Sequence, residues 1–259
     1  MKTARSSKGA TRRPGRPGPQ ETEKDQTRDT ILDAAEQLFS EAGYSATSFR
    51  AIASDANVNP ALISYYYGTK RALYEAVFKR RGRQLTERWR EMLDDLEARP
   101  GQTPTVEEIL RAFFLPQFEI KNSGPGGTAF VRLQTRVHAE PEEGAFTLRR
   151  QVYDKMGKRF IAALERALPD VDPADVNWRF IFIIGAGLYM TADVDRLDDL
   201  SSGRFRSNDL DEVLERLMGF CTHGIMAPST AWPRGRRAAP PRSGSRSGTR
   251  PGVAKRTVA

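Results

Sequence analysis

The fold is decided by residues 47–70, which read TSFRAIASDANVNPALISYYYGTK. Apolar residues recur at three-and-four spacing on both sides of Asn57, and this spacing predicts two short helices. Asn57 falls where a tight turn needs a positive φ, which asparagine tolerates better than most residues. Asn59 and Pro60 then supply an N-cap side chain followed by proline at the first helical position. Two short helices joined by a tight turn predict a helix-turn-helix.

Outward from this segment, helical spacing continues almost everywhere, and the period-two alternation of strands is rare. The apolar stripe that contains Ile31 and Phe39 predicts a longer helix before the pair, and Gly43 ends it as a left-handed cap. The sequence therefore predicts an all-α fold: an N-terminal three-helix helix-turn-helix domain and a C-terminal helical domain. We expect about nine helices, at 25–42, 48–55, 60–66, 70–97, 105–119, 128–139, 142–168, 173–195 and 209–226.

Positive charge is concentrated at the two ends of the chain. The net charge is +8, and residues 1–20 hold six Lys or Arg while residues 232–259 hold eight, with no acid in either segment. The remainder, 21–231, therefore carries −6. Both ends are rich in Gly, Pro, Ser and Arg, a composition that buries too little apolar surface to offset the entropy of ordering.

The sequence accordingly divides into four parts, which are a disordered basic arm (1–20), a helix-turn-helix domain (21–79), an effector-binding and dimerisation domain (80–228) and a disordered basic tail (229–259). Residues 13–17 of the arm are similar to the core of minor-groove AT-hooks, with Pro14 where that core has arginine. The alternative is a solvated linker with weak affinity for phosphate.

Several protein classes are disfavoured by what the sequence lacks. Cys221 is the single cysteine and the N-terminus shows no apolar leader, so we expect a cytoplasmic protein. We expect Cys221 to be a buried small apolar residue rather than a redox switch. The longest apolar stretch, 180–190, is shorter than the roughly 20 residues that a bilayer needs, so no membrane association is expected. His138 and His223 have no partners at metal-ligand spacing, and no phosphate-binding loop or nucleophile elbow is present. We expect no enzyme, no catalytic residue, no metal and no cofactor.

The third predicted helix carries more aromatic side chains than a short packed helix needs. Ile63 and Tyr67, four residues apart, can anchor it to the core, which leaves Ala61, Leu62, Ser64, Tyr65 and Tyr66 facing outward. Hydroxyls and a capped helix N-terminus are common phosphate contacts, and small apolar groups can meet a thymine methyl. The alternative for Tyr66 is a structural tyrosine with its hydroxyl in water.

Cations open the fourth predicted helix at the positive end of its dipole. Lys70 and Arg71 cost stability there by a few tenths of a kcal/mol, which a DNA phosphate would relieve. The alternative is that both side chains extend into solvent. Thr47 and Ser48, at the start of the second helix, can offer hydroxyl and backbone donors to a phosphate, although capping alone explains Thr47 equally well.

Residues 28–77 resemble the DNA-binding domain of the TetR/AcrR family of regulators. The resemblance is carried by ILDAAEQLF (31–39), Gly43-Tyr44, TSFRAIA (47–53), Val58 and YYYGTKRAL (65–73). Asn57 and Tyr67 depart from the usual glycine and phenylalanine, and Ser64 from a frequent tyrosine, which leaves the base preference open. The resemblance implies phosphate contacts from Thr47, Ser48, Tyr66 and Lys70 and places Pro60, Ala61, Leu62, Ser64 and Tyr65 near base edges. The predicted DNA-binding set is completed by Arg50 and Asn59.

Beyond residue 80 the chain resembles the family in pattern, with a closer likeness to fatty-acid-responsive members of the PsrA type. This likeness rests on Trp178-Arg179-Phe180, Gly185-Ala186 and residues 208–228. It implies a homodimer through the last two long helices and an enclosed effector pocket. The segment 175–193 is apolar nearly all round, which supports a dimer independently. The alternative is that these helices are the core of a monomer.

A pocket would draw on the aromatic and apolar side chains of the C-terminal domain, although such residues at helical spacing are more often plain core. The predicted lining is Phe113, Phe114, Phe118, Phe130, Leu133, Met156, Phe160 and Tyr189. Arg132, Arg136 and His138 offer a place for an acidic or thioester head group, unless they are solvent-exposed.

The leading interpretation is a ligand-responsive regulator, a repressor released from a palindromic operator in double-stranded DNA. Its effector would be small and largely apolar, with a fatty acid, an acyl thioester or an aromatic acid as candidates. An alternative is an architectural DNA binder in which the basic ends supply most of the affinity and no effector exists.

Overall fold

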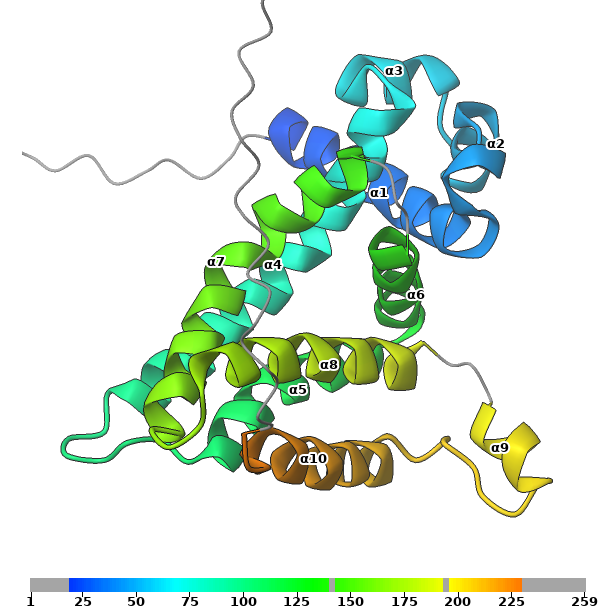
Figure 1. The fold of residues 1–259 in the computed structure, drawn as a ribbon. Coiled ribbons are helices and arrows are strands. Elements are labelled where there is room, and N and C mark those ends of the chain that lie inside the picture. Colours follow the sequence, from blue (N-terminus) through cyan, green and yellow to red (C-terminus); the bar gives the residue numbers. More distant parts are fainter. Residues whose placement is uncertain (1–18, 140–142, 193–195, 230–259) are drawn as a thin grey trace, which may run out of the picture. The chain divides into compact units, whose positions relative to one another are not determined.

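The computed structural model describes residues 19–139, 143–192 and 196–229, and this part of the chain contains ten helices and no strand (Figure 1). The all-α prediction is confirmed. The helices are α1 (Pro19–Ala46), α2 (Phe49–Asp55), α3 (Pro60–Tyr67), α4 (Lys70–Glu97), α5 (Val106–Lys121), α6 (Pro125–Ala139), α7 (Glu143–Ala167), α8 (Pro173–Thr191), α9 (Arg196–Ser201) and α10 (Leu210–Met226). Most of the predicted arm and tail, 1–18 and 230–259, lies outside the described residues.

The predicted turns of the first three helices are present. Gly43 adopts φ 79° and ends the regular part of α1, and Asn57 adopts φ 51° between α2 and α3. The Asn59 side chain accepts from the backbone N–H of Ala61, with Pro60 at the first position of α3. Local chemistry therefore sets the geometry of this segment, as the sequence predicts.

The core beneath these turns is formed by apolar side chains from all three helices. Ile31 and Phe39 of α1, Ile52 of α2 and Ile63 of α3 are completely buried. At about 25 cal/mol per Å² of apolar surface removed from water, such side chains supply most of the free energy that orders two helices too short to be stable alone.

Helix α4 passes through the predicted domain boundary at residues 79 and 80 without a break. Its first half packs against α1, where the rings of Tyr74 and Phe39 lie 5.0 Å apart. Its second half packs against α5 and α7, where the ring of Trp89 lies 5.1 Å from Phe113 and 5.9 Å from Tyr153. A single rigid helix thus connects the helix-turn-helix to the helices of the C-terminal half.

The C-terminal half packs α5 against α4, α6, α7, α8 and α10. Two predicted boundaries are corrected here. Pro125 starts α6 three residues early, because proline is favoured in a first helical turn. The predicted helix 173–195 ends at Thr191, and the unpredicted α9 follows, closed by a turn in which Ser202 and Gly203 both have positive φ.

Within the described residues, none of the helices is both long and apolar enough to cross a lipid bilayer.

Candidate nucleic-acid interface and interior cavity

The outer side of α3 is exposed, as the sequence predicts. Ile63 is completely buried and Tyr67 is half-buried, and these two side chains fix the helix to the protein. Tyr65 is 76% exposed, and Leu62 and Ser64 are exposed beside it. The helix therefore presents a hydroxyl, an aromatic ring and small apolar groups to the outside while its inner side stays anchored.

Three helix N-termini around this surface are capped by side-chain oxygens. Ser48 accepts from the N–H of Ala51 at 3.1 Å, Asn59 from Ala61 at 2.9 Å and Thr69 from Ala72 at 3.1 Å. The first two backbone N–H groups of α2 and of α4 are left to meet an anion, whereas in α3 Pro60 has no N–H and that of Leu62 donates to the Asn59 carbonyl at 2.9 Å. Arg50, in the first turn of α2, is exposed.

Thr47 differs from its predicted role. It is 3% exposed, and its hydroxyl donates to the carbonyls of Gly43 at 2.8 Å and Leu38 at 3.2 Å. Ser48, not Thr47, caps α2. The Thr47 hydroxyl closes the end of α1 and is turned away from the surface that a phosphate would approach.

Lys70 also lies differently from both interpretations of the sequence. Its Nζ donates to the carbonyls of Tyr44 at 2.9 Å, Thr47 at 2.9 Å and Ser45 at 3.4 Å, and it lies 4.5 Å from the centre of the Tyr44 ring. The ammonium therefore supports the turn between α1 and α2 and does not extend into solvent.

Arg71 points along its own helix rather than toward the α3 surface. Its Nε forms an ion pair with Glu75 at 3.1 Å, and its guanidinium lies 5.9 Å from the centre of the Tyr74 ring. Glu75 thus supplies a counter-charge to Arg71 within the protein, although Nη2 of Arg71 is buried without a hydrogen-bond partner among the residues that the structure describes.

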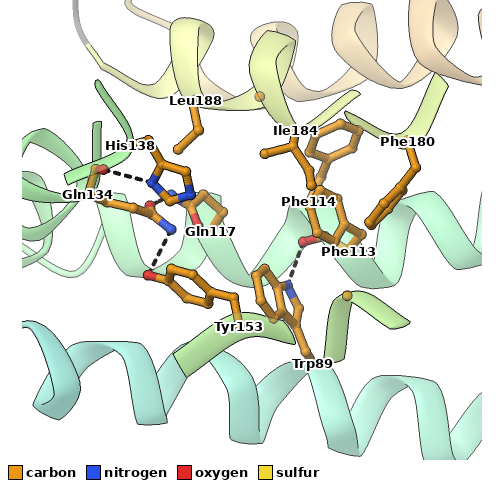
Figure 2. A pocket seen from close by; sticks show the side chains of 12 residues that line it. Trp89, Phe113, Phe114, Gln117, Gln134, His138, Tyr153, Phe180, Ile184 and Leu188 are labelled. Carbon is orange, nitrogen blue, oxygen red and sulfur yellow. Dashed lines mark hydrogen bonds between the residues drawn. The ribbon is translucent and has the colours of Figure 1, made fainter. Parts of the chain in front are cut away.

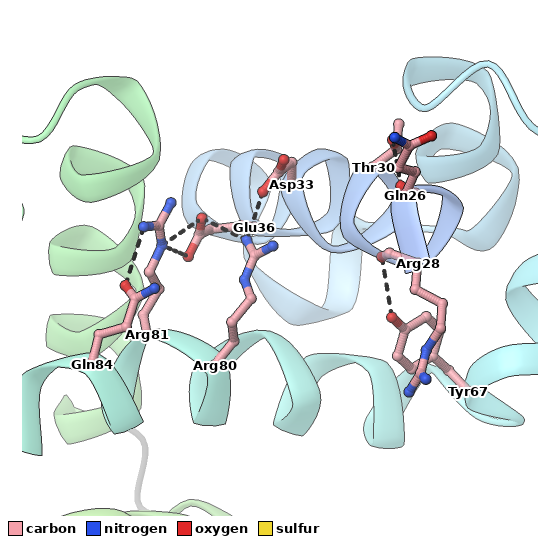
Figure 3. A network of polar contacts seen from close by, with 9 residues as sticks. All are labelled: Gln26, Arg28, Thr30, Asp33, Glu36, Tyr67, Arg80, Arg81 and Gln84. Atoms are coloured by element: carbon pink, nitrogen blue, oxygen red, sulfur yellow. Dashed lines mark hydrogen bonds and ion pairs between the residues drawn. The ribbon is translucent and has the colours of Figure 1, made fainter. Parts of the chain in front are cut away.

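Arg28 is a surface cation that the sequence reading missed. Its guanidinium lies 6.0 Å from the centre of the half-buried Tyr66 ring. Its backbone carbonyl accepts from the hydroxyl of Tyr67 at 3.2 Å (Figure 3). Burial raises the pKa of Tyr67, against the effect of Arg28. The only sequence signal for Arg28 is its position one turn before the apolar stripe of α1.

A buried carboxylate ties α1 to α4. Glu36 is 1% exposed and pairs with Arg80 at 3.1 Å and Arg81 at 3.1 Å, while Arg80 also reaches Asp33 at 2.8 Å (Figure 3). Burial raises the pKa of Glu36 despite the opposing effect of Arg81. Gly126 of α6 stands over this pair, since a Cβ there would lie 2.5 Å from an Arg81 nitrogen.

Helix α6 contacts α1 a second time near its own C-terminal end. Arg136 donates to the carbonyls of Ser40 at 3.2 Å and Glu41 at 3.1 Å. These carbonyls belong to the last turn of α1 before Gly43, where intrahelical partners run out. The same helix turns Gln134 and His138 toward the interior of the C-terminal half (Figure 2).

That interior contains a small cavity of about 70 Å³ among α4, α5, α6, α7 and α8 (Figure 2). One part of its wall is aromatic: the rings of Trp89 and Phe113 stack with centroids 5.1 Å apart, and Phe180 lies 5.1 Å from Phe113. The indole N–H of Trp89 donates to the Phe113 carbonyl at 2.7 Å, so this wall offers no free donor from the indole.

The opposite part of the wall is polar. Gln117 donates to Gln134, whose own amide donates to the Tyr153 hydroxyl at 3.1 Å. Nδ1 of His138 lies 2.9 Å from the backbone carbonyl of Gln134, and its ring stacks on Tyr153. Burial lowers the pKa of His138, with Arg149 acting in the same direction. The imidazole is therefore neutral near pH 7.

The predicted pocket residues are only partly brought together. Phe113 and Phe114 line the cavity. Tyr189 instead lies on an outer groove between α8 and α10. Five others are buried in the core without reaching the cavity, which corrects the prediction for them: Phe118, Phe130, Leu133, Met156 and Phe160.

Sequence reasoning missed the polar lining. Gln117 is 8% exposed and Gln134 is 3% exposed, and both lie on otherwise apolar helix faces. A glutamine within an apolar stripe was an available signal, because buried amides need partners. Arg132 and Arg136, predicted with His138 as a head-group site, are exposed, and only His138 reaches the cavity.

An exposed apolar face runs along α8 and α10. Trp178 and Phe182 of α8 are 65% and 63% exposed, and Phe220 of α10 is 73% exposed. Cβ atoms added to Gly185 and Gly219 on the same helices would meet no atom within 4 Å. Large apolar side chains clustered at a surface mark an interaction site.

Comparison with known proteins identifies the family. Residues 31–77 match the family described as bacterial regulatory proteins, tetR family, and residues 111–224 match that described as Tetracyclin repressor-like, C-terminal domain. Together the two matches cover more than half of the chain. The chain therefore belongs to the TetR family of transcriptional regulators, which bind DNA through a helix-turn-helix and are not enzymes.

Individual relatives agree. The chain is 34% identical over 88 residues to the probable regulator YttP of Bacillus subtilis, covering 34% of this chain and 41% of that protein. It is 42% identical over 65 residues to the repressor Rv3405c of Mycobacterium tuberculosis, covering 25% and 35%. The alignments thus span about two fifths of these curated relatives or less. The fold is similar to that of the fatty acid degradation regulator FadR of Bacillus halodurans, with TM-score 0.55, 16% identity and coverage of 80% and 97%.

Proposed function

We propose that the protein is a homodimeric, ligand-controlled repressor that binds a palindromic operator and acts in the cytoplasm. The main observation behind the proposal is the exposed outer side of α3. Tyr65 on this side is 76% exposed, while the buried Ile63 anchors the helix to the core. A short anchored helix with an exposed outer face has the dimensions that a major groove accepts. The similar protein Rv3405c is a transcriptional repressor, which supports the direction of regulation.

The proposed DNA contacts are the exposed groups around α3. Phosphates would be met by the N-terminal turn of α2 and by the hydroxyl of Tyr66, and base edges by α3. The set consists of Ser48, Arg50, Asn59, Pro60, Ala61, Leu62, Ser64, Tyr65 and Tyr66, with Arg28 added from the structure. We assign Thr47 and Lys70 to the support of this surface.

The dimer would form through the apolar face of α8 and α10. Trp178, Phe182 and Phe220 would leave water there, and the open surface at Gly185 and Gly219 permits close approach of a second copy. Two-fold pairing of two helices from each chain gives a four-helix interface. Two recognition helices would then stand roughly 34 to 36 Å apart, one turn of B-DNA.

Ligand control would act through α6. This helix lines the cavity with Gln134 and His138 and holds the end of α1 with Arg136. A ligand that binds better when α6 is displaced shifts the population toward that state, and the end of α1 moves with it. Affinity for the operator would fall by the same coupling factor.

Selection of DNA from a random pool by the purified full chain tests the proposal. We expect an inverted repeat with half-site centres about one or two helical turns apart. A Tyr65→Ala variant should enrich this repeat much less than the wild-type chain does, whereas Lys155→Met, which removes an exposed cation on α7, should enrich it equally. Random sequence from the wild-type chain would refute the repressor. A chain truncated after residue 231 should keep the preference, and its loss would favour the architectural alternative.

A further inference from the structure

The lining of the interior cavity contains no charged side chain. It is formed by aromatic and aliphatic residues, two glycines, two glutamines, a tyrosine and a neutral histidine. A buried charge without a partner costs several kcal/mol, far more than a buried neutral group that is hydrogen-bonded. The chemistry of the wall therefore selects against an ionised ligand.

The nearby cations do not line the cavity. Nη1 of Arg149 donates to the carbonyls of Val137 and His138, and Arg149 is not part of the lining. The buried Lys121 donates to the carbonyl of Thr191 at 3.0 Å and does not line the cavity. A carboxylate in the cavity would thus have to bring its own counter-charge or protonate His138.

Two acceptors of the polar wall have no partner among the described residues. His138 donates from Nδ1 to the Gln134 carbonyl, so Nε2 of the neutral ring carries a lone pair, and Figure 2 shows it turned away from that carbonyl. Gln117 uses its amide nitrogen on Gln134, which leaves its amide oxygen as an acceptor. A ligand with a hydrogen-bond donor would therefore satisfy an acceptor of this wall.

Tyr153 completes this polar end. Its hydroxyl oxygen accepts from the amide nitrogen of Gln134 at 3.1 Å, and burial raises its pKa, so the hydroxyl stays protonated. The hydroxyl proton is thereby available to an acceptor atom, such as the oxygen of an alcohol or phenol. A hydroxyl group, which both donates and accepts, matches this end better than a group that does only one.

The rest of the wall is suited to one aromatic ring. Trp89, Phe113 and Phe180 offer ring faces and edges, and ring pairs contribute about 0.5–1.5 kcal/mol beyond their buried area. The cavity of about 70 Å³ is smaller than the roughly 150 Å³ of an engineered cavity that binds benzene. A ring would therefore enter only with a displacement of the surrounding side chains or helices, and a long acyl chain would need far more.

We propose that this cavity binds an uncharged molecule with a single aromatic ring and a hydroxyl group, the chemical class of the phenols. Such a molecule would be the effector of the proposed repressor. Binding in the cavity does not depend on that proposed function, and only the effect of binding on operator affinity does. The fatty and aromatic acids expected from the sequence find no charged partner among the described residues of this wall.

Binding of three probes to the purified full chain tests the class directly. Phenol carries the ring and the donor, toluene carries the ring alone, and benzoate carries a charge. Calorimetry should give saturable binding of phenol, with benzoate and toluene each at least about tenfold weaker, since about 1.4 kcal/mol is a factor of ten. Operator affinity is measured separately with each probe present.

A variant on α7 locates the binding. A Cβ on Gly157, which lines the cavity, would meet no atom within 4 Å, so the Cβ that Gly157→Val introduces causes no clash. We expect phenol binding to fall at least about tenfold in this variant, while the melting temperature and operator affinity are retained. Lys158→Val, on the exposed side of the same helix, is the matched control and should bind phenol normally.

The outcomes separate the two proposals. Phenol binding that Gly157→Val removes, together with weaker operator binding, supports both. The same binding without any change in operator affinity keeps the ligand class and overturns ligand control. Absence of saturable phenol binding, or benzoate binding as tightly as phenol, overturns the class and leaves operator recognition untouched.

Discussion

Replacing Lys70 by methionine separates two roles for its ammonium group. An ammonium has three N–H donors. In the structure these donors meet the carbonyls of Tyr44, Ser45 and Thr47, in the segment between Gly43 and the start of α2. We therefore expect Lys70 to act on DNA binding indirectly, by holding the turn that positions α2 and α3. A lysine that contacts a phosphate would act directly, through its charge.

The expected destabilisation follows from these contacts. A hydrogen bond to a charged group contributes about 1.5–3 kcal/mol, and the lower value suits a half-buried lysine at a surface turn. The two bonds of 2.9 Å then give about 3 kcal/mol, and removing a cation from the N-terminal end of α4 returns about 0.5–1 kcal/mol. A net loss of about 2 kcal/mol lowers the melting temperature by about 4–8 °C in a chain of this size.

Thermal unfolding and operator binding across a salt series distinguish the roles. With an indirect role, the Lys70→Met variant melts earlier and binds more weakly, but log K falls with log salt at the wild-type slope. With a phosphate contact, the slope falls by about 0.9 per chain and the melting temperature stays unchanged. The second pattern would refute our assignment. Lys155→Met, which removes an exposed cation far along α7, should change neither quantity.

Three further outcomes follow from exposure and charge. Tyr65→Ala should weaken operator binding by about 1–3 kcal/mol at an unchanged melting temperature, because the side chain is 76% exposed; gel shift and calorimetry measure both. Trp178→Asp should shift the dimer toward monomer in sedimentation experiments if the face of α8 and α10 pairs. Burial lowers the pKa of His138 below its usual 6.5, so folding loses stability as pH falls below about 6.5. His138→Gln should lose less between about pH 7 and about pH 5.5 in urea unfolding, and an equal loss would contradict the assignment.

The helix-turn-helix was predictable because its determinants are local. A left-handed Asn57, a capped Asn59-Pro60 start and the spacing of Ile52 and Ile63 all act within a few residues, and the structure contains each of them. Thr47 was misassigned for the same reason. A threonine beside a serine gives two possible caps, and only the packing of α1 decides which hydroxyl turns inward.

The cavity was predictable only in its general place, because it depends on tertiary packing. Phe114 and Phe160 look alike in the sequence, yet Phe114 faces the cavity and Phe160 fills the core beside it. Gln117 and Gln134 come from different helices, and their pairing appears only when α5 and α6 pack. Periodicity identifies the buried side of each helix, but it does not tell which buried side chains leave a space.

The C-terminal end of α1 is contacted both by the helix that lines the cavity and by the helix that follows the DNA-binding surface. Its last carbonyls lie at the negative end of the helix dipole, and cations from two other helices reach them: Arg136 of α6 at Ser40 and Glu41, and Lys70 of α4 in the following turn. Lys70 belongs to the helix that carries the DNA-binding half, so its contact moves with that half. Arg136 belongs to a helix that also lines the cavity. A ligand that displaces α6 would therefore change the contact of Arg136 with α1 and leave the contact of Lys70 in place. With one contact changed and the other kept, the α2–α3 pair would rotate rather than unfold.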